Sequence, residues 1–178
     1  GDLDIKPRGS FKDWKNDVEN LILGNAPIET VVVIALSAVL IGYYRGVKDV
    51  TNAVVHIGGD STSGKSSALE AGIATTGNPS LQAEGLCKSW AATDNAVIDS
   101  LDSLFGVPVG RDELSLNESK NLSQLIYQLS MGRSRERLGK NCESVATKFF
   151  TTVLLSTGET GILSRCSGNT GLNIRVIE

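Results

Sequence analysis

The chain has 178 residues, 40% of them hydrophobic, which is enough to bury one substantial core but not a second large domain. The formal net charge of −3 argues against a protein that coats nucleic acid with its whole surface, although it leaves room for a local basic strip. Three cysteines, Cys87, Cys142 and Cys166, lack C-x-x-C spacing, which favours reduced thiols, a cytoplasmic location and no structural zinc.

The N-terminal part is expected to be helical. Residues 1–9 are typical of a tag or linker, and Ser10 can cap an amphipathic helix that ends at Gly24. Pro27 then opens an apolar helix. Its most apolar run, residues 31–41, is shorter than the ~20 residues of a membrane span, so we expect a fully buried helix and no membrane contact.

We therefore divide the chain into a helical segment over residues 10–46 and a core over residues 47–178. The sequence begins without methionine and stops inside an apparent strand at residues 173–178. We expect an excerpt of a longer protein.

A phosphate-binding loop is the most specific motif. Residues 59–66 fit the pattern G-x-x-x-x-G-K-[ST] at every fixed position. Residues 52–57 predict a strand before the loop and residues 67–74 a helix after it, an order that a Gly/Ser-rich surface turn would not require. The loop predicts ATP binding, with Lys65 at the outer phosphates and Ser66 on Mg²⁺. The predicted nucleotide contacts are Gly59, Asp60, Ser61, Thr62, Ser63, Gly64, Lys65, Ser66 and Ser67.

A second acidic motif follows at the distance that a hydrolytic ATPase needs. The interval leaves room for a strand near residues 85–90 and a helix over residues 93–105, so we expect an extra strand between the two motif strands. Residues 107–111 then lead as a strand, weakened by Pro108 and Gly110, to Asp112 and Glu113. We predict that Asp112 holds the Mg²⁺ shell and that Glu113 polarises the attacking water. The alternative is an ordinary exposed acidic pair.

The C-terminal third alternates helix, basic turn and strand. Ser115 and Glu118 have the form of a capping box before an apolar stripe that ends at Gly132. Residues 133–148 contain five basic and two acidic side chains, and residues 149–155 form a strong β run. The only histidine, His56, and also Trp90 are interpreted as core residues, although Trp90 could instead stack on a base.

The motif order resembles a bacterial and phage P-loop family known as domain of unknown function 927, found in replication proteins of mobile elements. The matching segments run from about residue 58 to residue 178 and include the phosphate loop, residues 89–95, Asp112-Glu113-Leu114, residues 126–129, residues 155–159, and Gly171 leading to Arg175. The family is similar to superfamily-three helicases of the AAA+ class. The resemblance implies an α/β P-loop NTPase of the AAA+ kind, whose mostly parallel sheet is flanked by helices and preceded by a small helical segment.

By this resemblance, Ser156 or Thr157 would sense the γ-phosphate, and Arg175 would be an arginine finger that reaches the ATP of a neighbouring subunit. The basic turn would be a hairpin in a central channel, with Arg133, Arg135, Arg137 and Lys140 as DNA contacts. Each role has an alternative: a solvated loop for the turn, an ion-pair partner for Arg175, and strand-end hydrogen bonding for Ser156 and Thr157.

Three functions remain open at this point. The leading one is an oligomeric ATPase, a ring that could be a hexamer, which moves or opens single- or double-stranded DNA. The second is an AAA+ ATPase that acts on protein partners. The third is a nucleotide-binding assembly module with little turnover.

Overall fold

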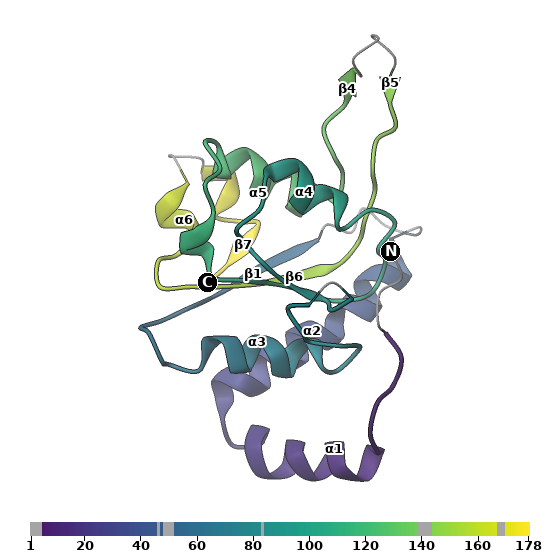
Figure 1. Ribbon diagram of the computed structural model, residues 1–178, viewed down its shortest axis with the longest axis vertical. Helices are drawn as coiled ribbons and strands as arrows, with labels where there is room; N and C mark the ends of the chain where they lie inside the picture. Colours follow the sequence, from purple (N-terminus) through teal and green to yellow (C-terminus); the bar gives the residue numbers. More distant parts are fainter. Residues whose placement is uncertain (1–4, 46, 48–51, 83, 139–143, 167–169) are drawn as a thin grey trace.

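A five-stranded parallel sheet forms the centre of the molecule, with helices on both faces (Figure 1). The computed structural model describes residues 5–45, 47, 52–82, 84–138, 144–166 and 170–178. The strands are β1 (Ala53–Gly58), β2 (Cys87–Ser89), β3 (Val109–Asp112), β6 (Val153–Gly158) and β7 (Val176–Ile177), in the order β2-β3-β6-β1-β7. The predicted α/β architecture is confirmed.

The two sheet faces bury separate apolar clusters. Helices α2 (Ala26–Tyr44) and α3 (Lys65–Ile73) cover the face to which Val55 and Leu155 belong. The other face, with Val54 and Leu154, packs under α4 (Asp94–Asp99), α5 (Leu122–Met131) and the short α6 (Ile162–Arg165). Neighbouring residues of a strand point to opposite faces, so consecutive side chains of β1 and β6 enter different environments.

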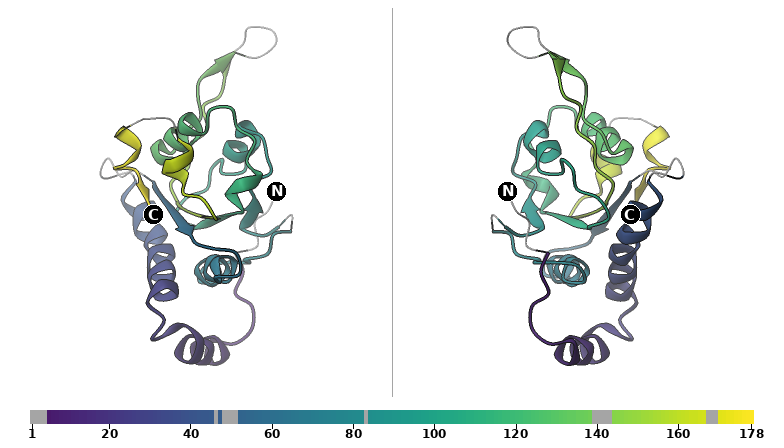
Figure 2. Two further views of the ribbon diagram at one scale, coloured as in Figure 1. Left: turned by 90° about the vertical axis from the view of Figure 1, so that its left-hand side faces the viewer. Right: turned by 90° about the vertical axis from the view of Figure 1, so that its right-hand side faces the viewer.

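The first helix is confirmed, with its predicted cap and stop. Helix α1 (Phe11–Asp17) continues into a π-helical turn (Val18–Ile22), and the Ser10 side chain accepts a hydrogen bond from the Asp13 N–H at 3.1 Å. Gly24 follows with φ of +88°, a left-handed conformation that glycine adopts without steric cost. Figure 2 shows α1 at the end of the molecule opposite the β4–β5 hairpin described below.

The prediction that the apolar helix is fully buried is wrong. Helix α2 has 19 residues and is long and apolar enough to cross a membrane by length and composition alone, a test that core helices of soluble proteins also pass. Only 22% of its most apolar 18-residue window is buried. One face packs on α3 and β6, whereas the opposite face exposes Val33, Leu36, Val39, Leu40 and Tyr43.

One strand lies between β1, which leads to the phosphate loop, and β3, which leads to the acidic pair. This strand is β6, not the strand expected near residues 85–90. Strand β6 pairs in parallel with β1 along its whole length and with β3 through Val109↔Leu154 and its neighbours. The strand expected near residues 85–90 is confirmed as β2, which lies at the sheet edge beyond β3. Glycine is favoured at position 110 of β3, because a Cβ there would lie only 2.6 Å from the Cys87 Sγ.

The predicted capping box is wrong. Residues Leu114–Leu116 form a 3-10 turn, and α5 begins only at Leu122, where the Asn121 side chain accepts a hydrogen bond from the Gln124 N–H at 3.1 Å. The predicted stop at Gly132 is confirmed by its left-handed φ of +67°.

The basic turn is an antiparallel hairpin that projects from the body (Figures 1 and 2). It consists of β4 (Arg137–Leu138) and β5 (Ser144–Val145), and a bridge between Arg133 and Phe149 continues the pairing toward the sheet. Lys148 forms a 2.9 Å ion pair with Asp99. The hairpin therefore has an anchored base beside α4.

Candidate functional site

The phosphate-loop sequence forms the turn between β1 and α3. Gly64 has φ of +84° and immediately precedes α3, so the first turn of that helix contains Lys65, Ser66 and Ser67. At Gly59 a Cβ would come within 2.9 Å of the Ser63 Oγ, which favours glycine in this tight turn. Thr62 also has positive φ, at 64°. Residues 59–64 thus lie at the carboxyl end of a central strand and before a helix N-terminus, which is an arrangement suited to phosphate.

The Lys65 ammonium is folded back over the loop. It donates hydrogen bonds to the carbonyl oxygens of Gly59 at 2.8 Å and Asp60 at 2.6 Å. A cation placed in the mouth of the turn can exchange these neutral acceptors for phosphate oxygens, to which charge-assisted bonds are stronger. The position agrees with the predicted role of Lys65.

Helix α3 and strands β3 and β6 bring three oxygen-bearing side chains together next to the phosphate loop. The Ser66 hydroxyl lies 3.1 Å from Asp112 Oδ1, and the Thr157 hydroxyl donates to the same oxygen at 2.5 Å. The Glu113 N–H in turn donates to Thr157 Oγ1 at 2.9 Å. Hydroxyl and carboxylate oxygens are the ligands that Mg²⁺ prefers, so Ser66 and Asp112 fit the predicted metal role.

Glu113 adopts a conformation that is uncommon for its residue type. Its φ of 61° and ψ of 80° are left-handed, a strained choice for a non-glycine residue and one often found at functional positions. Its carboxylate is turned toward the following residues, where Oε1 accepts bonds from the Ser115 hydroxyl at 2.6 Å and the Ser115 N–H at 3.3 Å. Sequence reasoning missed Ser115 in this role.

An arginine from α6 holds the turn that follows Glu113. The Arg165 guanidinium donates to the Leu114 carbonyl and, at 2.8 Å, to the Asn117 carbonyl. Because α6 follows β6 directly, this contact joins the strand of Thr157 to the turn of Glu113. No sequence motif indicates this contact, since the partners are 51 and 48 residues apart.

The two sensor candidates occupy different faces of β6. Thr157 contacts the acidic pair, whereas Ser156 is buried on the opposite face, where Trp90 Nε1 donates to its hydroxyl at 3.0 Å. His56 Nδ1 also lies 3.0 Å from the Ser156 hydroxyl. Ser156 is therefore part of a buried polar network and does not contact the acidic pair. The interpretation of Trp90 and His56 as core residues is confirmed, because their exposed fractions are 0% and 3%.

Burial lowers the pKa of His56, while the Glu178 charge and the Thr160 backbone oppose this shift. The neutral imidazole is thus favoured within the core.

Arg175 lies far from the phosphate loop of its own chain. In the pairing of β7 with β1, Val176 aligns with Val54, which places Arg175 beside the first residue of β1, whereas the loop follows the last. The guanidinium lies 5.1 Å from the Tyr127 ring and donates to the Gly171 carbonyl at 2.5 Å. These contacts supply a structural role, and any contact with a nucleotide would have to be made with a neighbouring subunit.

The predicted DNA contacts that the structure describes lie in β4 or just before it. Arg133 and Arg135 precede β4, and the Arg135 guanidinium donates to Gln124 Oε1 at 3.1 Å. The backbone of Arg137 belongs to β4. Lys140 lies outside the described residues.

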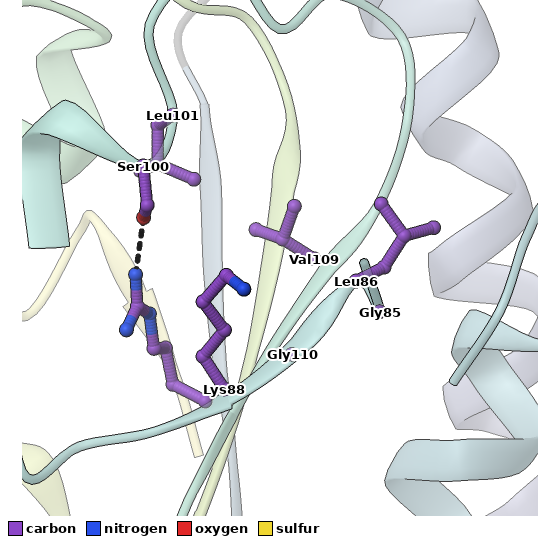
Figure 3. A pocket seen from close by; sticks show the side chains of 8 residues that line it. Gly85, Leu86, Lys88, Ser100, Leu101, Val109 and Gly110 are labelled. Carbon is purple, nitrogen blue, oxygen red and sulfur yellow. Dashed lines mark hydrogen bonds between the residues drawn. The ribbon is translucent and has the colours of Figure 1, made fainter. Parts of the chain in front are cut away.

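Arg111, next to Asp112 in β3, is a buried cation. Arg111 is 3% exposed, and its guanidinium contacts the Ser89 carbonyl at 3.2 Å and the Ser100 hydroxyl, the contact marked in Figure 3. Desolvation lowers the pKa of Arg111 to about 10. The cavity around it, about 10 Å³, is too small for a ligand larger than water, so Arg111 ties β3 to β2 and α4.

Comparison with known proteins gives a family and a fold. The profile of the family described as "Domain of unknown function (DUF927)" matches residues 2–148. Among solved structures, the chain is similar to SCCmec type IV Cch, described as an active helicase, with a TM-score of 0.84 and 29% sequence identity. The match covers 99% of this chain and 32% of the Cch chain, so this chain spans about a third of that helicase's length. No curated protein sequence matches.

Proposed function

The chain belongs to the family described as domain of unknown function 927, and we propose that it is the Mg²⁺- and ATP-dependent motor domain of a DNA helicase or helicase-like replication protein of a mobile element. The observation that supports this most directly is the convergence of Ser66, Asp112 and Thr157 beside the phosphate loop. We favour a motor that acts on DNA over one that remodels proteins, because 99% of the chain is similar to a structure described as an active helicase.

In this proposal the ATP phosphates bind the turn of residues 59–64 and the first turn of α3. Lys65 leaves its two carbonyl acceptors and neutralises the outer phosphates. Ser66 and Asp112 would hold Mg²⁺, which supplies charge neutralisation at the phosphates when bound. Ser67, in the same helical turn, would complete the phosphate contacts.

Glu113 and Thr157 are assigned to the hydrolytic step. Glu113 would orient and polarise the attacking water, for which its carboxylate must turn away from Ser115. Thr157 bonds both the Asp112 carboxylate and the Glu113 backbone, so it is placed to couple the γ-phosphate to both acids. Ser156 is not included in this proposal, because its hydroxyl is bound to Trp90 and lies beside His56.

Assembly and DNA contact are the remaining parts of the proposal. Arg175 could reach only a neighbour's ATP, which requires an oligomer, and a ring that could be a hexamer would meet this requirement. The β4–β5 hairpin would contact DNA through the basic side chains of residues 133–140.

Steady-state ATP hydrolysis with and without single-stranded DNA tests the proposal, with Glu113→Gln as the matched inactive control. We expect DNA-stimulated turnover in the wild type and little turnover in the variant. Turnover that DNA does not change would favour an ATPase that acts on protein partners. ATP binding without turnover in the assembled wild-type protein would identify an assembly module.

A further inference from the structure

An open groove lies at the end of the molecule opposite the hairpin, away from the phosphate loop. One wall is the N-terminal segment from Ile5 to Phe11 together with Trp14, and the other is the segment after α3, residues 74–79. The groove has a volume of about 590 Å³, within the range of sites that hold a nucleotide-sized group. Because residues 74–79 follow the last turn of α3, the groove and the phosphate loop lie at opposite ends of that helix.

Two aromatic rings form an exposed platform on this groove. Phe11 and Trp14 are stacked with their ring centroids 5.9 Å apart and an angle of 26° between their planes. They remain 75% and 42% exposed, although large aromatic side chains usually bury most of their surface. Much of the surface of these two rings is therefore accessible to a flat ligand.

The cationic side chains of the groove favour an anionic ligand, and the aromatic platform favours one that also has flat rings. Among the described residues, the lining contains two cationic side chains, Lys6 and Arg8, and no carboxylate. The opposite wall contributes Thr75, Thr76 and Asn78, which are polar and uncharged. Unpaired nucleic acid has these properties, because its bases expose stacking faces and its backbone is anionic.

We propose that this groove binds single-stranded nucleic acid, with one or two bases stacked on Phe11 and Trp14 and the backbone beside Lys6 and Arg8. This site is separate from the hairpin and from the ATP site. A strand bound here would be held at the far end of the molecule from the β4–β5 hairpin (Figure 2).

Tryptophan fluorescence offers a direct test, because the chain has two tryptophans in opposite environments. Trp14 is 42% exposed and Trp90 is fully buried, so stacking of a base quenches Trp14 and leaves Trp90 as an internal reference. We expect oligo(dT) and oligo(rU), added without nucleotide, to quench the emission, and a blunt duplex of equal length to quench much less. Omitting ATP makes the result independent of the proposed hydrolysis.

Variants of Trp14 test the stacking contact. Trp14→Ala is expected to weaken oligo(dT) binding about tenfold, measured by anisotropy of a labelled strand, since base stacking on one ring has an effect of this order. Trp14→Phe keeps a ring, so it should bind nearly as the wild type while it loses the quenching signal. This variant also guards against a folding defect in Trp14→Ala. Tyr43→Ala, at a 75% exposed ring of α2 outside the groove, is the control and is expected to bind normally.

Three results would overturn the proposal. Wild-type emission that oligo(dT) leaves unchanged, or an affinity for oligo(dT) that Trp14→Ala leaves unchanged, would exclude base stacking on this platform. Equal quenching by duplex and single strand would show attraction to phosphate without stacking.

Discussion

Glu113 is the residue on which hydrolysis depends in this account, and its carboxylate is bound to Ser115 in the structure. A hydrogen bond to a charged group contributes roughly 1.5–3 kcal/mol, and this energy opposes rotation of Glu113 toward a water at the phosphate loop. The left-handed backbone of Glu113 and the Arg165 contacts fix the turn, so the side chain is the part that must move.

Replacing Ser115 with Ala is therefore expected to raise basal ATP turnover by about tenfold, because the lower end of this range, about 1.5 kcal/mol, corresponds to roughly that factor and the Ser115 N–H bond is kept. The measurement is steady-state hydrolysis without DNA. Ser119→Ala is the control, since Ser119 bonds Asp94 at 2.9 Å and not Glu113. A fall in turnover in Ser115→Ala would mean that Ser115 orients Glu113 for catalysis.

His56 predicts a pH dependence of stability. Burial lowers its folded-state pKa below 6.5, so the unfolded chain binds the proton first as the pH falls. The free energy of unfolding should therefore be unaffected by His56 above pH 6.5. It should decrease below that pH, down to the folded-state pKa, by at most about 1.4 kcal/mol per pH unit.

His56 is the only histidine, so an NMR titration of its imidazole measures this pKa without ambiguity. A midpoint below 6.5 is expected. A midpoint at or above 6.5 would contradict the burial argument.

At the scale of elements, the hairpin gives a prediction about nucleic acid. Replacing Arg137 and Lys140 with Ala is expected to weaken binding of single-stranded DNA and to flatten its salt dependence, by about 0.7 in log–log slope for each lost phosphate contact. Titrations at several salt concentrations measure the slope. Lys120→Ala, an exposed lysine before α5, is the control. Unchanged affinity and slope in the double variant would leave the hairpin as a solvated loop.

Much of the fold could be predicted from sequence because its strongest signals are local. The phosphate loop, the Ser10 cap and the Gly132 stop each depend on a few adjacent residues, and the structure has all three elements as predicted. Residues 52–57 and 149–155 likewise predicted β1 and β6, although β6 begins only at Val153 and continues to Gly158. The capping box failed because Asn121 offers a competing cap closer to the apolar stripe.

The parts that sequence reasoning could not supply depend on long-range contacts. Thr157 faces the acidic pair and Ser156 does not, because the two residues lie on opposite faces of β6. The pairing of β6 between β1 and β3 determines these faces. No motif indicates the contacts of Arg165 or the bond between Ser115 and Glu113. The half-exposed state of α2 was also missed, because its apolar residues surround the helix and give no preferred side.

At the scale of the whole molecule, Arg175 tests assembly. If it acts on a neighbour's ATP, Arg175→Ala should reduce turnover about a thousandfold while ATP affinity and thermal stability are largely kept. Mixing Arg175→Ala with Glu113→Gln should restore part of the activity, because some sites then pair an intact glutamate with an intact arginine. Hydrolysis by mixed rings of known composition is the measurement. No recovery, or unfolding of Arg175→Ala, would leave Arg175 as the structural partner of Tyr127 and Gly171.

Binding of Mg²⁺-ATP, measured by calorimetric titration, tests the central claim most directly, since every other role depends on a nucleotide in the phosphate loop. We predict that the wild type and Glu113→Gln bind one ATP per chain with similar affinity. Lys65→Ala should show no measurable binding, because the loop amides and the helix N-terminus alone cannot balance a triphosphate. Wild-type affinity in Lys65→Ala would contradict the assignment of residues 59–66 as the nucleotide site.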